Sequence, residues 1–142
     1  MAPIPILLCG KLPSHIQATS DIVKPEFNVI KVCSDPEAAR AAVTALMSTT
    51  TEKRTLEGIE YPRPHVIIMG AGYTHDDFAS IRETIAGATS VPWVRPSVAK
   101  PGAQRPSGPP PAEEIAGRLR KTLDEHLEEI QAGKGAGEIW WM

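Results

Sequence analysis

Residues that could bind a ligand or take part in catalysis follow an apolar run in the middle of the chain, where VIIM at residues 66–69 leads into GAGYTHDD. An imidazole can transfer protons near neutral pH, so His75 is a candidate catalytic acid or base. Glycines allow backbone amides to approach a bound group closely, and a helix that begins at Thr74 would turn its positive dipole end toward an anion. Besides His75, this stretch supplies the ligand-binding candidates Gly70, Gly72, Tyr73 and Thr74.

The turn after the first apolar run, CGKLPSH at residues 9–15, supplies a second group. Its thiol, Cys9, is a candidate nucleophile, because a helix N-terminus nearby would stabilise a thiolate. Lys11 and, after a later apolar run, Arg95 would provide cations for the phosphate or carboxylate of an anionic ligand. The other ligand-binding candidates in this turn are Gly10, Ser14 and His15.

Each candidate also has a structural interpretation, and the sequence leaves the choice open. GAGYT is an ordinary strand-to-helix turn if Thr74 is the N-cap and the two aspartates after His75 offset the helix dipole. Free cysteine is among the most buried residue types, and Cys9 lacks the arginine of a Cys-x5-Arg phosphatase signature. The position six residues after Cys9 is occupied by His15, which is either a member of the site or an exposed residue.

Apolar runs alternate with helical patterns along the chain. Strands are expected where short apolar runs end in turn residues, at residues 4–9, 27–33, 65–70 and 91–95. Helices are expected where apolar residues recur at helical spacing, at residues 14–24, after a capping-box pattern at 34–37, after Thr74 and at 112–131. Residues 48–64 are polar and are expected to form a fraying helix end and a loop.

This order of elements predicts one α/β domain over residues 1–142, because right-handed crossovers place helices on both faces of a parallel sheet. We expect a three-layer, Rossmann-like or flavodoxin-like fold with a mainly parallel sheet, the strand order 2-1-3-4 and a possible short fifth strand at the C-terminus. Ligands of such sheets bind beyond the carboxyl ends of the strands, where the strand order reverses. The turns after the first, third and fourth strands meet there, so the candidate residues share one edge.

Charge and cysteine content narrow the choice of partners. Charged residues make up 23% of the chain, the net charge is -2 and the basic residues are scattered, so we expect neither nucleic acid nor a membrane as a partner. No apolar stretch reaches the roughly 18 residues of a spanning helix, which favours a cytoplasmic protein. The two cysteines belong to no CxxC or Cys/His cluster, which predicts free thiols and no metal site.

Two further segments are unusual in composition. Residues 96–111 contain six prolines and two glycines, which predicts an extended loop or a lid. The tail, residues 136–142, carries Trp140 and Trp141, which we expect to dock on another surface. The long C-terminal helix and this tail therefore predict a homo-oligomer.

The segments PILLCGK, VIIMGAGY and VPWVRP, with the proline-rich segment and the aromatic tail, resemble small single-domain Rossmann-like proteins of filamentous fungi. The resemblance covers nearly the whole chain and implies the fold, without a catalytic residue. The start is also similar to dinucleotide-binding domains, but GxGxxG would need glycines at Leu12 and His15, so NAD(P) binding is less favoured. The order of elements resembles phosphoacceptor receiver domains, whose acidic positions hold Cys9-Gly10-Lys11 and Met69-Gly70 here, which excludes that function.

Two functions from different classes follow. The first is a small cofactor-independent enzyme, a lyase, hydratase or isomerase that acts on an anionic or carbonyl-bearing metabolite. In it, His75 is the acid or base, Lys11 and Arg95 hold the anion, and amides of the glycine turns polarise an oxygen. The alternative is a non-catalytic Rossmann-like binding or scaffold module. We favour the first, because the three turns carry Lys, His and Arg where a scaffold would need none.

Overall fold

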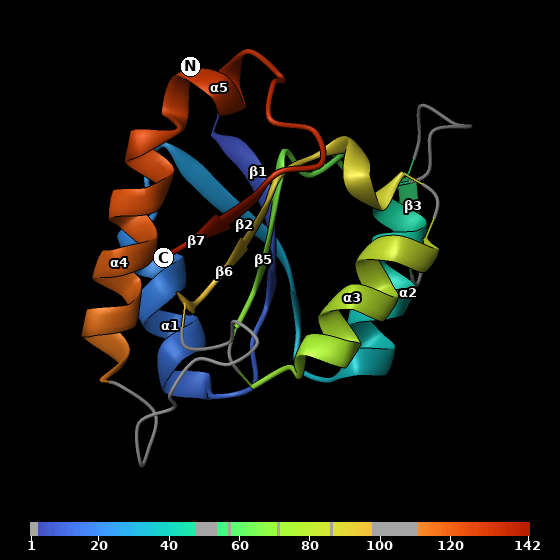
Figure 1. Ribbon diagram of the computed structural model, residues 1–142, viewed down its shortest axis with the longest axis horizontal. Helices are drawn as coiled ribbons and strands as arrows, with labels where there is room; N and C mark the ends of the chain where they lie inside the picture. The colour runs from blue at the N-terminus through green and yellow to red at the C-terminus, as the bar shows by residue number, and fades with distance from the viewer. Residues whose placement is uncertain (1–2, 48–53, 57, 71, 86, 98–110) are drawn as a thin grey trace.

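A computed structural model describes residues 3–47, 54–56, 58–70, 72–85, 87–97 and 111–142 (Figure 1). Its main sheet has five strands, all parallel, in the order β2-β1-β5-β6-β7. These strands are β1 (Ile4–Cys9), β2 (Phe27–Cys33), β5 (Val66–Met69), β6 (Trp93–Arg95) and β7 (Ile139–Trp141). The predicted strand order and the short fifth strand are confirmed.

Helices cover both faces of the sheet, which makes three layers (Figure 1). On one face α1 (Pro13–Ile22) packs beside α4 (Ala112–Glu125), and on the other α2 (Pro36–Leu46) lies beside α3 (His75–Thr84). Alternate residues of β1 point to opposite faces, so Leu7 and Cys9 join the core under α2 and α3, whereas neighbouring residues join the core under α1 and α4. Helices begin at the carboxyl ends of the strands, which places α1 and α3 beside the expected ligand edge.

The loop predicted at residues 48–64 is partly wrong, because residues 54–61 contain an antiparallel hairpin. Its strands are β3 (Arg54–Leu56) and β4 (Ile59–Tyr61). Three residues are too few to show a strand alternation in sequence. Gly58 between them has a φ of 78°, a left-handed conformation that glycine adopts without strain.

The helix expected at residues 112–131 is interrupted at His126. The long helix α4 ends at Glu125, and a short helix, α5 (Leu127–Gln131), follows. The His126 ring stacks on Trp140 of β7, with 3.9 Å between the ring centroids. This contact joins the end of α4 to a strand, so helical periodicity alone does not reveal it.

Smaller differences concern helix caps and short connections. Asp35, rather than Ser34, is the N-cap of α2, and its carboxylate accepts from the Ala38 amide at 2.7 Å. A short 3-10 helix, η1 (Ala88–Ser90), precedes β6 and was not expected. Most of the predicted lid, residues 98–110, lies outside the described residues.

Candidate functional site

The turns after β1 and β5 lie against each other at the carboxyl edge of the sheet. The Gly70 amide donates to the Cys9 carbonyl at 2.8 Å, and the Gly10 amide donates to the Cys33 carbonyl at 2.9 Å. A Cβ added to Gly70 would lie 3.9 Å from the Cα of Gly10, so the two turns are in van der Waals contact. The structure thus brings together the two glycine turns on which the sequence prediction rests.

Arg95 reaches this edge from the end of β6, but as a buried residue. Its side chain has 0% exposure, and its guanidinium donates to the backbone carbonyls of Met69, Gly70 and Tyr73, at 3.3, 2.7 and 3.2 Å. The guanidinium carbon also lies 5.0 Å from the centroid of the Phe78 ring. These contacts favour a structural role for Arg95, which holds the β5–α3 turn in place, over the predicted role as an anion-binding arm.

Tyr73 joins the β5–α3 turn to the end of β2. Its side chain has 0% exposure, and its hydroxyl donates to the Cys33 carbonyl at 2.8 Å. Burial is the largest cause that raises the pKa of Tyr73 above its usual value of 10, and nearby Cys9 and Cys33 add to the effect. Tyr73 is therefore a neutral hydrogen-bond donor in the core, and its ring is covered from solvent.

Lys11 crosses from the β1–α1 turn to the β5–α3 turn. A Cβ added to Gly72 would lie 3.1 Å from Cδ of Lys11, so the missing side chain at Gly72 makes room for the lysine stem. The Lys11 ammonium lies 5.1 Å from the centroid of the Tyr73 ring. Lys11 is exposed, and no ion pair of its ammonium occurs within the part of the chain that the structure describes. Lys11 therefore offers a cation to solvent at this edge.

Cys9 is unsuited to the nucleophilic role suggested for it. Its side chain has 0% exposure and belongs to the core under α2 and α3. A hydrogen bond with the Cys33 side chain, together with burial, raises the pKa of the Cys9 thiol well above its usual value. A nucleophilic cysteine needs a thiolate and access to substrate, and this environment opposes both.

The start of α3 satisfies its own amides. The Thr74 hydroxyl accepts from the Asp77 amide at 3.0 Å, and the Asp77 carboxylate accepts from the Thr74 amide at 3.1 Å, which completes a capping box. Asp76 and Asp77 also place negative charge in the first turn. The structural interpretation of Thr74 is thus correct, and an anion at this helix start would meet two carboxylates.

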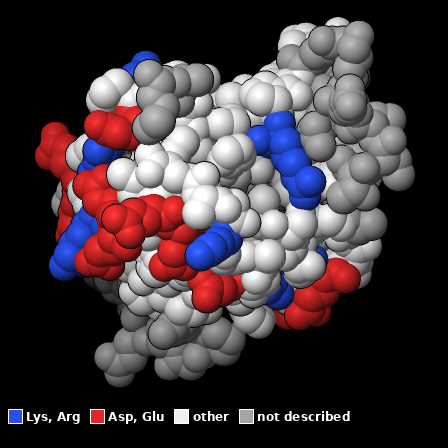
Figure 2. Space-filling model, turned by 90° about the horizontal axis from the view of Figure 1, so that it is seen from above, with Lys and Arg blue, Asp and Glu red and all other residues white. Residues whose placement is uncertain are grey.

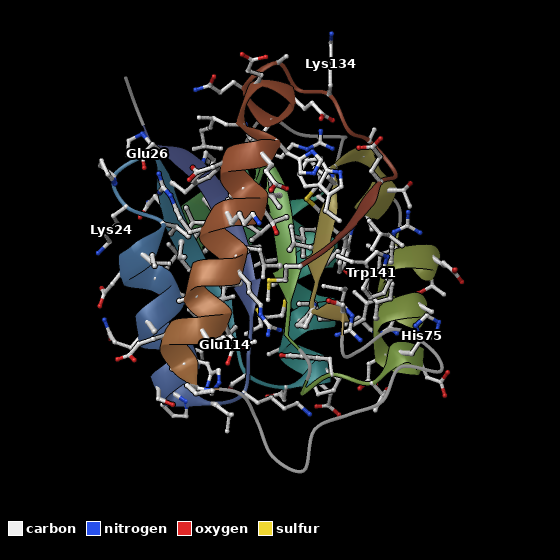
Figure 3. All side chains as sticks on the ribbon, turned by 60° about the vertical axis from the view of Figure 1, so that its left-hand side comes forward. Lys24, Glu26, His75, Glu114, Lys134 and Trp141 are labelled. Carbon is white, nitrogen blue, oxygen red and sulfur yellow. The ribbon has the colours of Figure 1, made fainter. Side chains whose placement is uncertain are left out.

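His75 is the first residue of α3 and is exposed. Its ring centroid lies 6.0 Å from that of Phe78, so the imidazole rests at the margin of the core. Figure 3 shows His75 at the same end of the molecule as Glu114, the first-turn residue of α4, and opposite Lys134. His75 remains accessible for proton transfer, and its catalytic role stays a prediction.

The start of α1 differs from that of α3. Its N-cap is Leu12, no side chain caps it, and its first turn contains no acidic residue. Pro13 occupies the first helical position, where the missing amide costs nothing, and Ser14 and His15 follow. The Ser14 hydroxyl lies 3.5 Å from Nδ1 of His15. Of the helices at this edge, α1 keeps its positive dipole end without an internal counter-charge.

Sequence reasoning missed two members of this edge. The Cys33 carbonyl accepts from both Gly10 and Tyr73, although the sequence predicts no role for Cys33 at this edge. Phe78 is the second member, and its ring lies against the Arg95 guanidinium. Backbone acceptors have no sequence signature, and an aromatic in a helical stripe does not show which cation it contacts.

The aromatic tail packs against other residues of the same chain. Trp140 is 7% exposed, and its indole donates to the Glu138 carboxylate at 2.9 Å in addition to the stack on His126. The tail therefore docks in its own domain, and the homo-oligomer stays a prediction.

In the described segments, no helix has the length and apolar character to cross a membrane. Within the same segments, no group of His, Cys, Asp and Glu is suited to hold a metal ion.

The fold and this edge define a flavodoxin-like α/β domain. The response regulator domain of Thermotoga maritima CheB is a similar solved structure, with a TM-score of 0.51, 16% sequence identity and coverage of 92% of this chain and 96% of that one. At this identity the similarity shows the fold alone. The parallel order β2-β1-β5-β6-β7 agrees with it.

Similarity in sequence to a fungal protein identifies the family of the chain. Kojic acid related protein 6 of Aspergillus oryzae is 30% identical over 126 residues, which cover 87% of this chain and 78% of that protein. The chain belongs to the family of this fungal protein, which confirms the resemblance to proteins of filamentous fungi. No model of a protein family matches the chain.

Proposed function

We propose that the protein binds a small anionic metabolite, with a carboxylate or phosphate, at the carboxyl edge of the sheet beside the start of α1. One contrast carries this proposal. The first turns of α2, α3 and α4 contain acidic residues, whereas that of α1 contains none and is not capped by a side chain. Because an uncapped helix start attracts negative charge, an anion is favoured at α1 over its neighbours.

Lys11 supports the same location. It immediately precedes Leu12, the N-cap of α1, and its stem lies on Gly72. Its contact with the Tyr73 ring is of cation–π type, which at an exposed site contributes about 0.5–1 kcal/mol and leaves the charge available. The ammonium and the backbone amide of Ser14 could therefore both bind the same anionic group.

The opposite end of the molecule is less suitable for an anion. Figure 2 views that end, and most Asp and Glu side chains in the view lie on its left side, with some Lys and Arg among them, which is the side of α4 and α5 in Figure 1. Helix α5 carries Glu128 and Glu129 in its first turn. Like charges at that end would repel a carboxylate or phosphate, so charge also favours the α1 start.

Chemistry at this edge would depend on histidine. With Cys9 and Arg95 buried, His15 in α1 and His75 in α3 are the residues of the candidate set that could transfer a proton to or from a bound anion. A lyase, hydratase or isomerase would use one of them, and no cofactor enters this scheme. Binding alone would make the protein a sensor or carrier of the same ligand.

Thermal unfolding in the presence of phosphate, succinate or kojic acid, at constant ionic strength, tests the proposal. Kojic acid, which has neither a carboxylate nor a phosphate, is included only because the name of the Aspergillus relative mentions it. A binding anion should raise Tm saturably, since ligand at 100 times its Kd adds about 2.7 kcal/mol of stability. Lys11→Ala should weaken this effect, whereas Lys134→Ala at the opposite end should not. The same response in both variants, or no saturable response to phosphate or succinate, contradicts the proposal.

A further inference from the structure

The two cysteines of the chain are neighbours in the sheet. Cys9 ends β1 and Cys33 ends β2, and their Cα atoms are paired in the register of these parallel strands. Both side chains belong to the same apolar core. The chain contains only these two cysteines, which lie 24 positions apart in sequence (33 minus 9).

We propose that Cys9 and Cys33 form a reversible disulfide when the protein meets a peroxide. Neighbouring strands lie about 4.8 Å apart, and this spacing falls within the Cα separation that a disulfide spans. Both side chains of the paired positions join the same core, so a bond between the sulfur atoms requires no change of register. The proposal does not depend on a bound anion.

The chemistry balances with the peroxide as oxidant. One thiol attacks a peroxide oxygen, the O–O bond breaks, and a sulfenic acid and one water form. The second thiol then attacks the sulfenic sulfur, the S–O bond breaks, and a second water leaves as the S–S bond forms. The protein loses two electrons and two protons in total, and hydrogen peroxide is reduced to two water molecules. Both thiols are protected in the closed fold, so the first attack requires a local opening that exposes one of them as a thiolate. The other cysteine is its neighbour in the register of the strands and reacts next.

Because the two cysteines are buried, we expect them to react with small oxidants and not with large disulfide reagents. The exposures of Cys9 and Cys33 are 0% and 1%, so large disulfide reagents are excluded while the edge is closed. The pair nevertheless lies at the ends of its strands, and the next residues along the chain, Gly10 and Ser34, are partly or fully exposed. Tyr73 covers the pair from the ligand edge through its bond to the Cys33 carbonyl. A small oxidant needs only a local opening there.

Intact-mass analysis of the folded protein after treatment with hydrogen peroxide tests the proposal. We expect the loss of two hydrogen atoms, reversal by dithiothreitol, and a non-reduced digest with the Cys9 and Cys33 peptides linked. Cys9→Ala and Cys33→Ala should each abolish this mass loss. Three results would overturn the proposal: addition of oxygen without loss of hydrogen, a disulfide between two chains, or no thiol oxidation at a dose that oxidises the urea-unfolded protein. The mass change of the wild-type protein tests the proposal by itself, so the test does not depend on whether the variants fold.

Discussion

Replacement of Arg95 by methionine should destabilise the domain by about 3 kcal/mol. Methionine keeps the length of the buried stem but leaves the carbonyls of Met69, Gly70 and Tyr73 without the guanidinium. A buried acceptor left without its partner costs about 1–3 kcal/mol. The Gly70 carbonyl keeps a hydrogen bond from the Tyr73 amide at 3.2 Å, so we assign it the lower cost, about 1 kcal/mol. The carbonyls of Met69 and Tyr73 are each assigned the middle of the range, about 2 kcal/mol.

The costs of the three carbonyls add up to about 5 kcal/mol. The variant no longer buries a charge, and we take this gain as about 2 kcal/mol, which leaves a net loss of about 3 kcal/mol. Urea unfolding followed by tryptophan fluorescence measures the difference. The matched control is Arg118→Met, which removes an exposed arginine paired with Glu114 and should change stability by less than about 0.5 kcal/mol. An Arg95→Met protein within about 0.5 kcal/mol of the wild type would refute the assignment of Arg95 as a structural clamp.

Two further predictions concern Tyr73 and Gly87. Burial raises the pKa of Tyr73 above 10, so the folded state keeps a proton that the unfolded chain loses, and stability should fall as pH rises beyond about 10. Tyr73→Phe should flatten this decline in urea unfolding between pH 9 and 11, and an equal decline in both proteins would contradict the burial effect. A Cβ at Gly87, whose φ is 83°, would lie 2.2 Å from the Met47 carbonyl, so Gly87→Ala should cost about 2 kcal/mol or more. Gly117→Ala, in open space on α4, should instead stabilise by about 0.5–1 kcal/mol, and similar effects of the two substitutions would argue against the close approach at Gly87.

The fold was predictable because its signals are local. Strand β5 is buried along its whole length and reads as the continuous apolar run VIIM, as expected for a strand with helices on both faces. The capping box of Thr74 and Asp77 has a sequence pattern of its own. The hairpin of β3 and β4 lacked such a signal, because each strand has only three residues.

The site was predictable in location but less so in the role of each residue. Topology alone placed the turns of β1, β5 and β6 at one edge. Whether a cation there faces solvent or the core depends on the neighbouring side chains: Lys11 lies over a glycine and stays exposed, whereas Arg95 lies between backbone carbonyls and Phe78. One sequence gives the residue types at the edge, and tertiary packing decides which of them a ligand can reach.

The amide resonance of Ser14 in a 15N-labelled sample, titrated with phosphate at constant ionic strength, tests the central proposal most directly. If the anion binds at the start of α1, the Ser14 resonance should shift saturably, the Asp76 and Asp77 amides at the start of α3 should shift little, and Lys11→Ala should weaken the Ser14 response. Equal, unsaturated shifts at both helix starts, or a Ser14 response that Lys11→Ala leaves unchanged, would contradict an anion site at α1.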